Sequence, residues 1–250
     1  MHTRNEMPDV VQAAPDNYLL RALRPPDFER LRPHLQPSEH ASGEILYEPG
    51  DSVSHAYFPL GRALAAHRVM LPDGRGVETA LIGSEGAIGG IVSHGRLPAY
   101  ARAVVQYGGN FLKISSSQLE AQKRASNSLN HLFARYADCL LAQIFQSTAC
   151  NATHSIEERA AKWILAAQER LGSQEVPLTQ EQLGSLLGVG RSYVSRVIQK
   201  MRVAGLVETR RGRIVIRKRA ELAARACGCA KLVRHHYEEV LGGVYSAAFD

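Results

Sequence analysis

The sequence predicts an α+β protein in which a β-roll is followed by a long helix and then by a winged helix-turn-helix. Three observations support this order. Between residues 36 and 118, short apolar segments alternate with Gly, Pro and Asp turn signals. Residues 116–150 contain neither proline nor glycine. After residue 151, helical periodicity leads into a strongly basic segment that contains Arg-Arg-Gly-Arg. The period of the apolar pattern thus changes twice along the chain.

Residues 17–118 are expected to form the first domain, a jelly-roll-like β-roll with a short helical preamble. The preamble, residues 17–35, is interrupted by Pro25 and Pro26. The following apolar stretches, such as EILYEPG and HAYFPLG, are four to seven residues long and end in turn signals. Short strands separated by turns every 8–12 residues or so are typical of β-sandwiches and barrels.

Residues 119–150 are expected to form a dimerisation helix, within an amphipathic stretch roughly 30 residues long. Apolar residues recur there at three- and four-residue spacing. A small domain cannot cover so long a stripe alone, although part of it is expected to pack on its own roll. The same helix of a second copy is therefore the expected partner. The predicted interface consists of Leu129, Leu132, Phe133, Tyr136, Leu140 and Ile144.

Residues 151–219 are expected to form a winged helix-turn-helix with two recognisable helix starts. Ser155 is followed three residues later by Glu158, which is the spacing of a capping box. That helix should end at Gly172. Thr179 with Gln182 repeats the same spacing at the start of the next helix. A glycine-marked corner, Gly-Val-Gly, follows that helix.

The helix after this corner has one apolar and one polar face. Its apolar residues recur at i, i+3, i+4 and i+7: Val194, Val197, Ile198 and Met201. The opposite face contains no acid. Arginine, glutamine and serine can each hydrogen-bond to base edges in the major groove. A helix, a tight turn and a second helix form the DNA-binding helix-turn-helix. The predicted base-reading residues are Arg191, Ser192, Ser195, Arg196 and Gln199.

A wing is expected after the recognition helix, where two short strands flank Arg-Arg-Gly-Arg. Residues 191–219 contain ten Lys or Arg and one acid, whereas the net charge of the whole chain is only +6. Such a local concentration of positive charge is typical of a nucleic-acid contact. The predicted phosphate contacts are Thr179, Gln180, Lys200, Arg210, Arg211 and Arg213.

Residues 220–250 are expected to form a helical extension, and neither a metal nor a cofactor is predicted. Cys227 and Cys229 are too closely spaced for the usual zinc pair, and only His235 and His236 stand nearby as a second pair. We therefore interpret the two cysteines as small apolar residues of a helix. Disulfides are not expected in a protein without a secretory signal.

Two further expectations concern location and activity. No apolar run approaches the roughly 18 residues of a membrane span, so a cytoplasmic protein without membrane contact is expected. The histidines of residues 36–118 are isolated, which argues against a metal-dependent enzyme. The alternative to a protein that reads a DNA sequence is a ligand-binding or scaffold dimer whose basic tail binds nucleic acid without sequence specificity.

Residues 178–216, LTQEQLGSLLGVGRSYVSRVIQKMRVAGLVETRRGRIVI, resemble the winged helix of the Crp/Fnr family of bacterial transcription regulators. The segment beginning GEILYEPGDSVSHAYFPLG is similar to that family's sensor domain, a cyclic-nucleotide-binding-type roll. The resemblance implies a homodimer that binds a two-fold site in double-stranded DNA, with one recognition helix in each half-site. It also implies RNA polymerase as a partner and a small-molecule effector, which the sequence does not identify.

Two positions depart from the family pattern. In the recognition helix the family often has Arg-Glu-x-x-x-Arg, and here Ser192 replaces the glutamate between Arg191 and Arg196. The carboxylate that accepts from cytosine N4 is therefore missing, and a different half-site is expected. In the sensor domain, the Arg-Ser pair of the family's cyclic AMP binders is replaced by Pro98-Ala99-Tyr100. Cyclic AMP is thus not the expected effector. The remaining candidates for effector contacts are Glu85, Arg96, Tyr100 and Arg102.

Overall fold

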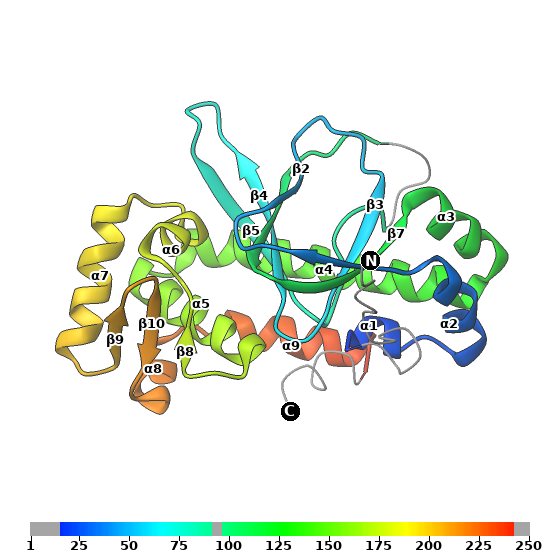
Figure 1. Cartoon of the computed structure of the whole chain (residues 1–250). Helices are drawn as coiled ribbons and strands as arrows, with labels where there is room; N and C mark the ends of the chain where they lie inside the picture. Colours follow the sequence, from blue (N-terminus) through cyan, green and yellow to red (C-terminus); the bar gives the residue numbers. More distant parts are fainter. Residues whose placement is uncertain (1–15, 92–96, 243–250) are drawn as a thin grey trace, which may run out of the picture.

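The computed structural model describes residues 16–91 and 97–242, and these form a β-roll flanked by helices (Figure 1). The winged helix lies at one end of the molecule and the N-terminal helices at the other. The long helix α4 connects the two ends. The α+β class predicted from the sequence is confirmed. No helix in the described ranges is long and apolar enough to cross a membrane.

The preamble consists of α1 (Tyr18–Arg21), α2 (Pro25–Leu31) and a 3-10 turn (Arg32–His34). Asn17 joins this preamble to the roll. Its side-chain oxygen accepts from the backbone N–H of Leu20 at 3.0 Å and so caps α1. Its amide donates to the carbonyls of Pro59 and Gly86, each at 2.9 Å. Because Asn17 is fully buried, these bonds satisfy polar atoms that water cannot reach.

Two antiparallel sheets form the roll, as the turn spacing predicted. Their strands are β1 (Gln36–His40), β2 (Ile45–Tyr47), β3 (His55–Pro59), β4 (Leu64–Met70), β5 (Gly76–Ile82), β6 (Arg102–Tyr107) and β7 (Gly109–Ser115). The first sheet has the order β1-β7-β3 and the second β2-β6-β4-β5. An apolar cluster that includes Tyr47, Ile82 and Phe111 fills the roll. Inward-facing side chains of both sheets contribute to it, as in other double-layered β folds.

The stretch without proline or glycine forms two helices, not one. α3 (Ser116–Ala125) ends before Ser126, and α4 (Asn127–Thr153) begins after it. Ser126 has an extended backbone with φ −142°. Its hydroxyl accepts from the N–H of Leu129 and donates to the carboxylate of Asp27 at 2.5 Å. Serine competes with the helical backbone through such local bonds, so the single helix expected over this stretch is divided here.

The predicted dimer stripe of α4 requires correction, because most of it packs within its own chain. Leu129, Phe133 and Tyr136 are at most 1% exposed, and Leu132 is also buried. They share a core cluster with the roll residues Phe58, Leu112 and Ile114. The Tyr136 hydroxyl also accepts from the N–H of Ala87 at 3.0 Å and donates to its carbonyl at 2.9 Å. A second copy cannot bury side chains that are already covered.

The C-terminal part contains α5 (Ile156–Leu171), β8 (Glu175–Val176), α6 (Gln180–Leu187), α7 (Arg191–Val203), β9 (Val207–Arg210) and β10 (Arg213–Ile216). Both predicted capping boxes are confirmed, Ser155 with Glu158 and Thr179 with Gln182. Gly172 ends α5 in the left-handed conformation, with φ +58°. The three helices enclose a core that contains Trp163, Leu183 and Val197.

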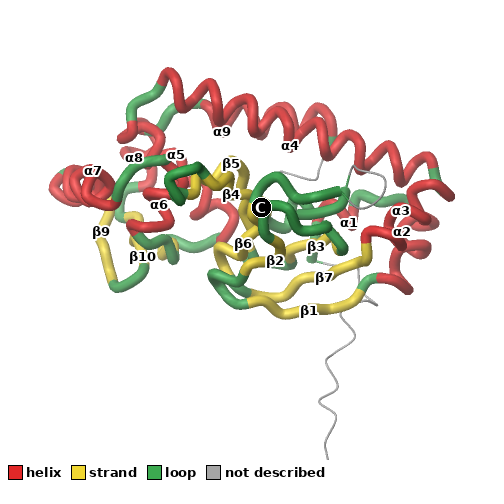
Figure 2. Tube along the Cα trace, turned by 90° about the horizontal axis from the view of Figure 1, so that it is seen from above, coloured by secondary structure: helices red, strands yellow, loops and turns green. Residues whose placement is uncertain are grey.

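Two further helices follow the wing, α8 (Arg219–Arg225) and α9 (Cys229–Val240). Figure 2 shows α9 lying beside α4 on one side of the roll. The two helices run in opposite directions. Cys229, at the start of α9, accepts from Gln146 near the end of α4, and Tyr237 is buried in the cluster that contains Phe133. The extension therefore covers part of α4 that the roll leaves open.

Candidate nucleic-acid interface

The polar face of α7 is exposed along its whole length. Val194, Val197, Ile198 and Met201 are buried, as their spacing predicted. The opposite face is presented to solvent by Arg191, Ser192, Ser195, Arg196 and Gln199. The structure thus brings the predicted base-reading residues together on one outward surface of one helix. α7 lies at the outer end of the molecule (Figure 1).

Two glycines allow α6 and α7 to approach each other. A Cβ atom on Gly184 would lie 2.9 Å from the carbonyl oxygen of Val189, which is too close for carbon and oxygen. Gly188 ends α6 with φ +68°, a conformation that glycine adopts without steric cost. The N–H of Val189 then donates to the carbonyl of Gly184 at 3.0 Å. Gly184 stands inside a helical apolar pattern, which gives no sign of this role.

Tyr193 is an exposed residue of α7 that the sequence analysis did not include in the recognition face. The guanidinium carbon of Arg196 lies 5.1 Å from the centroid of its ring. A cation over an aromatic face is attracted by the ring quadrupole. The Arg196 side chain is therefore held along the helix surface. The three-residue spacing of the two side chains is the signal that could have identified this pair.

Several of the predicted phosphate-binding cations already form ion pairs with glutamates. Arg210 and Arg213 both donate to the carboxylate of Glu175 on β8, at 2.6 and 2.9 Å. Lys200 is paired with Glu157 at the start of α5. The hydrogen bond from Arg213 holds the pKa of Glu175 below its usual value, so this carboxyl stays ionised at neutral pH.

The other predicted phosphate contacts differ in whether their side chains already have a partner within the chain. Arg211 is exposed at the turn of the wing, next to Gly212 with φ +73°, and has no ion pair among the described residues. The Thr179 hydroxyl is engaged in capping, because it accepts from the N–H of Gln182 at 3.1 Å. Gln180 begins α6 directly after Thr179 and is partly exposed. A helix start of this kind offers backbone N–H groups to an anion.

A Crp-like helix-turn-helix family model matches residues 158–225. Residues 158–225 thus belong to a Crp-like helix-turn-helix domain, and the chain shares its fold with regulators of the Crp/Fnr family. FixK2 from Bradyrhizobium japonicum superimposes with a TM-score of 0.67 at 17% identity, over 77% of this chain and 98% of FixK2. A regulator of the Crp/Fnr family from Eubacterium rectale gives 0.67 at 15% identity, over 83% and 96% of the two chains.

A third relative, TTHB099 from Thermus thermophilus, has a TM-score of 0.63 at 22% identity. The superposition covers 76% of this chain and 96% of TTHB099. At these identities the likeness concerns the fold. Comparison with the curated proteins gives no match. The C-terminal match and the fold over 76–83% of the chain both agree with the Crp/Fnr resemblance found in the sequence.

The candidate effector residues do not gather in one place. Glu85 is buried and pairs with Arg170 of α5 at 3.1 Å. Arg102 pairs with Glu48 at 2.7 Å, and Tyr100 is 84% exposed. Arg96 lies outside the described residues. Of the three candidates that the structure describes, Glu85 and Arg102 are engaged in separate ion pairs and Tyr100 faces solvent.

A hollow of about 230 Å³ lies in the roll instead, beside α4. Its described lining includes Tyr47, Val53, His67, Pro98 and Leu140, and contains no lysine or arginine. Burial lowers the pKa of His67 to about 4, so this imidazole is neutral at neutral pH. The hollow therefore offers an anionic ligand no positive charge from its described residues.

The pairing of the wing with Glu175 leads to a prediction for DNA binding. Glu175→Gln should raise the affinity for every duplex by about two- to fivefold at low salt, because Arg210 and Arg213 no longer divide their contacts between a carboxylate and phosphate. Fluorescence anisotropy with a random-sequence duplex measures this. Glu39→Gln, an equal change of charge on exposed β1, is the control. An increase of the same size in the control would show that net charge alone is responsible.

Proposed function

We propose that this protein is a homodimeric regulator that binds a two-fold DNA site in a sequence-specific manner, with α7 in the major groove. The observation that carries the proposal is the acid-free polar face of α7 beside a basic wing. Side chains on such a helix contact base edges, while the wing and the start of α6 hold phosphates. By analogy with the family, RNA polymerase is the expected protein partner of the DNA-bound form.

Base reading is assigned to the residues predicted from the sequence, with Tyr193 beside them. Arg196 is the principal candidate, because arginine forms two hydrogen bonds to guanine and the ring of Tyr193 restricts its conformations. Gln199 suits adenine, and it accepts from Arg202 at 3.1 Å in the free protein. Ser192 cannot accept from cytosine as a glutamate would. We therefore expect a half-site that differs from the family's usual one.

The roles of helix and wing can be separated with two arginine substitutions. Arg196→Ala should cost about 1–3 kcal/mol on the selected site and relax the preference at one base pair. Arg211→Ala should weaken binding to all duplexes alike and reduce the salt slope by about one. Selection of duplexes from random DNA, followed by titration at several salt concentrations, measures both. If Arg196→Ala retained the parent's sequence preference, the proposed docking would be wrong.

Dimerisation is assigned to a different face of α4 from the one predicted. His131, Ala134, Asp138, Leu141, Phe145 and Thr148 are all exposed and are separated by alternating steps of three and four residues. This is the spacing of a coiled-coil seam. Phe145 is 64% exposed and Leu141 is 45% exposed, which is unusual for large apolar side chains. The predicted Leu140 and Ile144 are partly buried and flank this seam.

Phe145→Glu should convert the protein to monomers at micromolar concentration. Each copy would place a carboxylate in the seam, and burial of like charges without partners costs several kcal/mol. Sedimentation velocity measures the state of assembly. Val203→Glu introduces the same charge at an exposed apolar position of α7 and should remain dimeric. A parent protein that sediments as a monomer at this concentration would refute the assignment.

We propose that the effector, if the roll binds one, is not cyclic AMP. A cyclic phosphate carries a full negative charge, and its removal from water requires a cation and oriented donors. The described lining of the hollow beside α4 has no cation. Arg102, the one described arginine among the candidate effector residues, is paired with Glu48. An uncharged or weakly polar ligand suits this lining better.

Isothermal titration with cyclic AMP tests this proposal. No saturable binding tighter than about 10 μM is expected. Tight binding that is lost in Arg102→Ala or Arg96→Ala, but kept in Arg62→Ala on the exposed surface of the roll, would contradict it. In that case one of the two arginines would be the missing cation.

The alternative function is a scaffold dimer that binds nucleic acid without sequence preference. The same selection experiment separates the two, since a scaffold would enrich no sequence. We also infer that the protein is not an enzyme and acts in the cytoplasm, because two of the proteins with the same fold are described as transcriptional regulators. Neither inference depends on the identity of the effector.

A further inference from the structure

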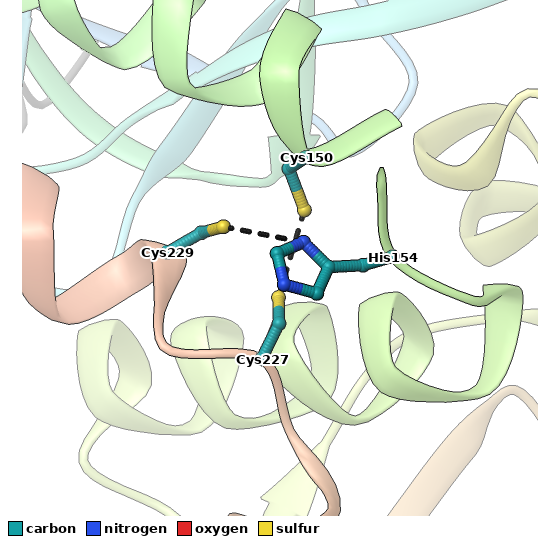
Figure 3. A group of neighbouring side chains, drawn as sticks. All are labelled: Cys150, His154, Cys227 and Cys229. Atoms are coloured by element: carbon teal, nitrogen blue, oxygen red, sulfur yellow. Dashed lines mark hydrogen bonds between the residues drawn. The ribbon is translucent and has the colours of Figure 1, made fainter. Parts of the chain in front are cut away.

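Four side chains that commonly bind metals meet where α4 is followed by α5. Cys150 belongs to the last turn of α4, and His154 is the residue that ends this helix. Cys227 lies in the connection between α8 and α9, and Cys229 is the first residue of α9. Figure 3 shows all four side chains pointing toward one another. One potential ligand atom from each lies within 4.8 Å of the other three.

Two of the separations are close to the edges of a tetrahedron around a single ion. Two Zn–S bonds of about 2.3 Å at the tetrahedral angle place the sulfurs about 3.8 Å apart, and a sulfur and a nitrogen lie slightly closer. The Sγ atoms of Cys150 and Cys227 are 3.5 Å apart. The Sγ of Cys229 is 3.6 Å from Nδ1 of His154. Three cysteines and one histidine are a common ligand set of structural zinc sites.

Buried positive charge beside the cluster supplies an independent argument. Lys162 and Arg159 of α5 are both buried. Lys162 Nζ lies 3.4 Å from the Sγ of Cys150 and 4.5 Å from the centroid of the Trp163 ring. In the described ranges neither cation forms a salt bridge with a carboxylate; Nη2 of Arg159 donates to the carbonyl of Leu187 at 2.8 Å, but its Nε has no hydrogen-bond partner. Burial of unpaired cations is costly.

A metal ion would balance this charge. One divalent ion with three thiolates carries a net charge of −1, which opposes the charge of Lys162. Four neutral side chains would leave the lysine uncompensated. The amide of Gln146 also donates to the Sγ of Cys229 at 3.2 Å, as donors around thiolate ligands usually do. The surroundings of the four side chains are therefore those of an anionic complex.

We propose that Cys150, His154, Cys227 and Cys229 bind one zinc ion, which fastens the connection between α8 and α9 to the end of α4. Thiolate and imidazole ligands in tetrahedral geometry favour zinc over magnesium or calcium. The ion would hold α9 against α4 at the point where the DNA-binding domain begins. This inference does not depend on the DNA sequence that the protein reads.

The proposal corrects the interpretation of the two C-terminal cysteines as apolar helix residues. In the sequence, His235 and His236 are the nearest possible partners of these cysteines, but His235 is exposed and pairs with Glu239 of its own helix at 3.5 Å. The second pair is Cys150 with His154, four residues apart at the end of a helix. It lies 77 residues from Cys227 along the chain, so only the fold brings the two pairs together.

Elemental analysis of the untagged full-length protein, purified under reducing conditions without chelator, tests the proposal. We expect about one zinc ion per chain. Cys227→Ser and His154→Ala should lose most of it. Cys139→Ser, at a buried cysteine outside the cluster, and His235→Ala should retain it. Retention of zinc by Cys227→Ser and His154→Ala, or loss in the two controls, would overturn the assignment.

A second measurement covers the case in which the variants fail to fold. Cobalt added to the chelator-stripped parent should give the visible bands of a tetrahedral thiolate site with one equivalent bound, and zinc should displace it. Metal removal should also lower the melting temperature of the parent, since binding contributes to folding. A parent that binds neither ion, contains a Cys150–Cys227 disulfide, or holds iron with inorganic sulfide would refute the proposal.

Discussion

Burial of the apolar surface of α4 is the constraint on which the rest of the described structure depends. A helix of 27 residues with apolar side chains on several faces must have each face covered, because exposed apolar surface costs about 25 cal/mol per Å². The roll covers the face of Phe133 and Tyr136, and α9 lies along another with Tyr237. Leu141 and Phe145 remain exposed. The arrangement of the roll, the extension and the proposed dimer all follow from the division of this one surface.

The same helix determines where the DNA-binding domain sits. α5 begins three residues after α4 ends, and direct contacts with the roll then fix it. Glu85 of the roll forms a buried ion pair with Arg170, and in α6 Gln182 and Ser185 donate to the sheet. A buried ion pair is sensitive to geometry, because separation of its charges leaves both without water. The loop that carries Glu85 is therefore mechanically coupled to the DNA-binding domain.

The charge of the DNA-binding domain is partly neutralised within the chain. Glu175, Glu157 and Glu208 each hold at least one cation of the basic segment. Surface pairs of this kind are weak, so a phosphate backbone can displace them. Arg211 and the face of α7 stay free of carboxylates in the described chain. The free protein thus carries less exposed positive charge than its sequence suggests, and the face of α7 that is proposed to read bases is a part that is not neutralised.

The sequence by itself determined the features that depend on local chemistry. The capping boxes at Ser155 and Thr179, the helix end at Gly172 and the two faces of α7 are encoded by residues within a few positions of one another, and all were predicted correctly. The break at Ser126 was missed, because the local bond to Leu129 is supported by a second bond to Asp27, about a hundred residues away. Apolar periodicity likewise could not show which face of α4 packs on its own roll. Burial by the roll, by α9 or by a second copy requires the same kind of apolar side chain. Only the tertiary structure decided that question, and only the tertiary structure brought Cys150 within 3.5 Å of Cys227, because their proximity arises from the packing of α9 along α4.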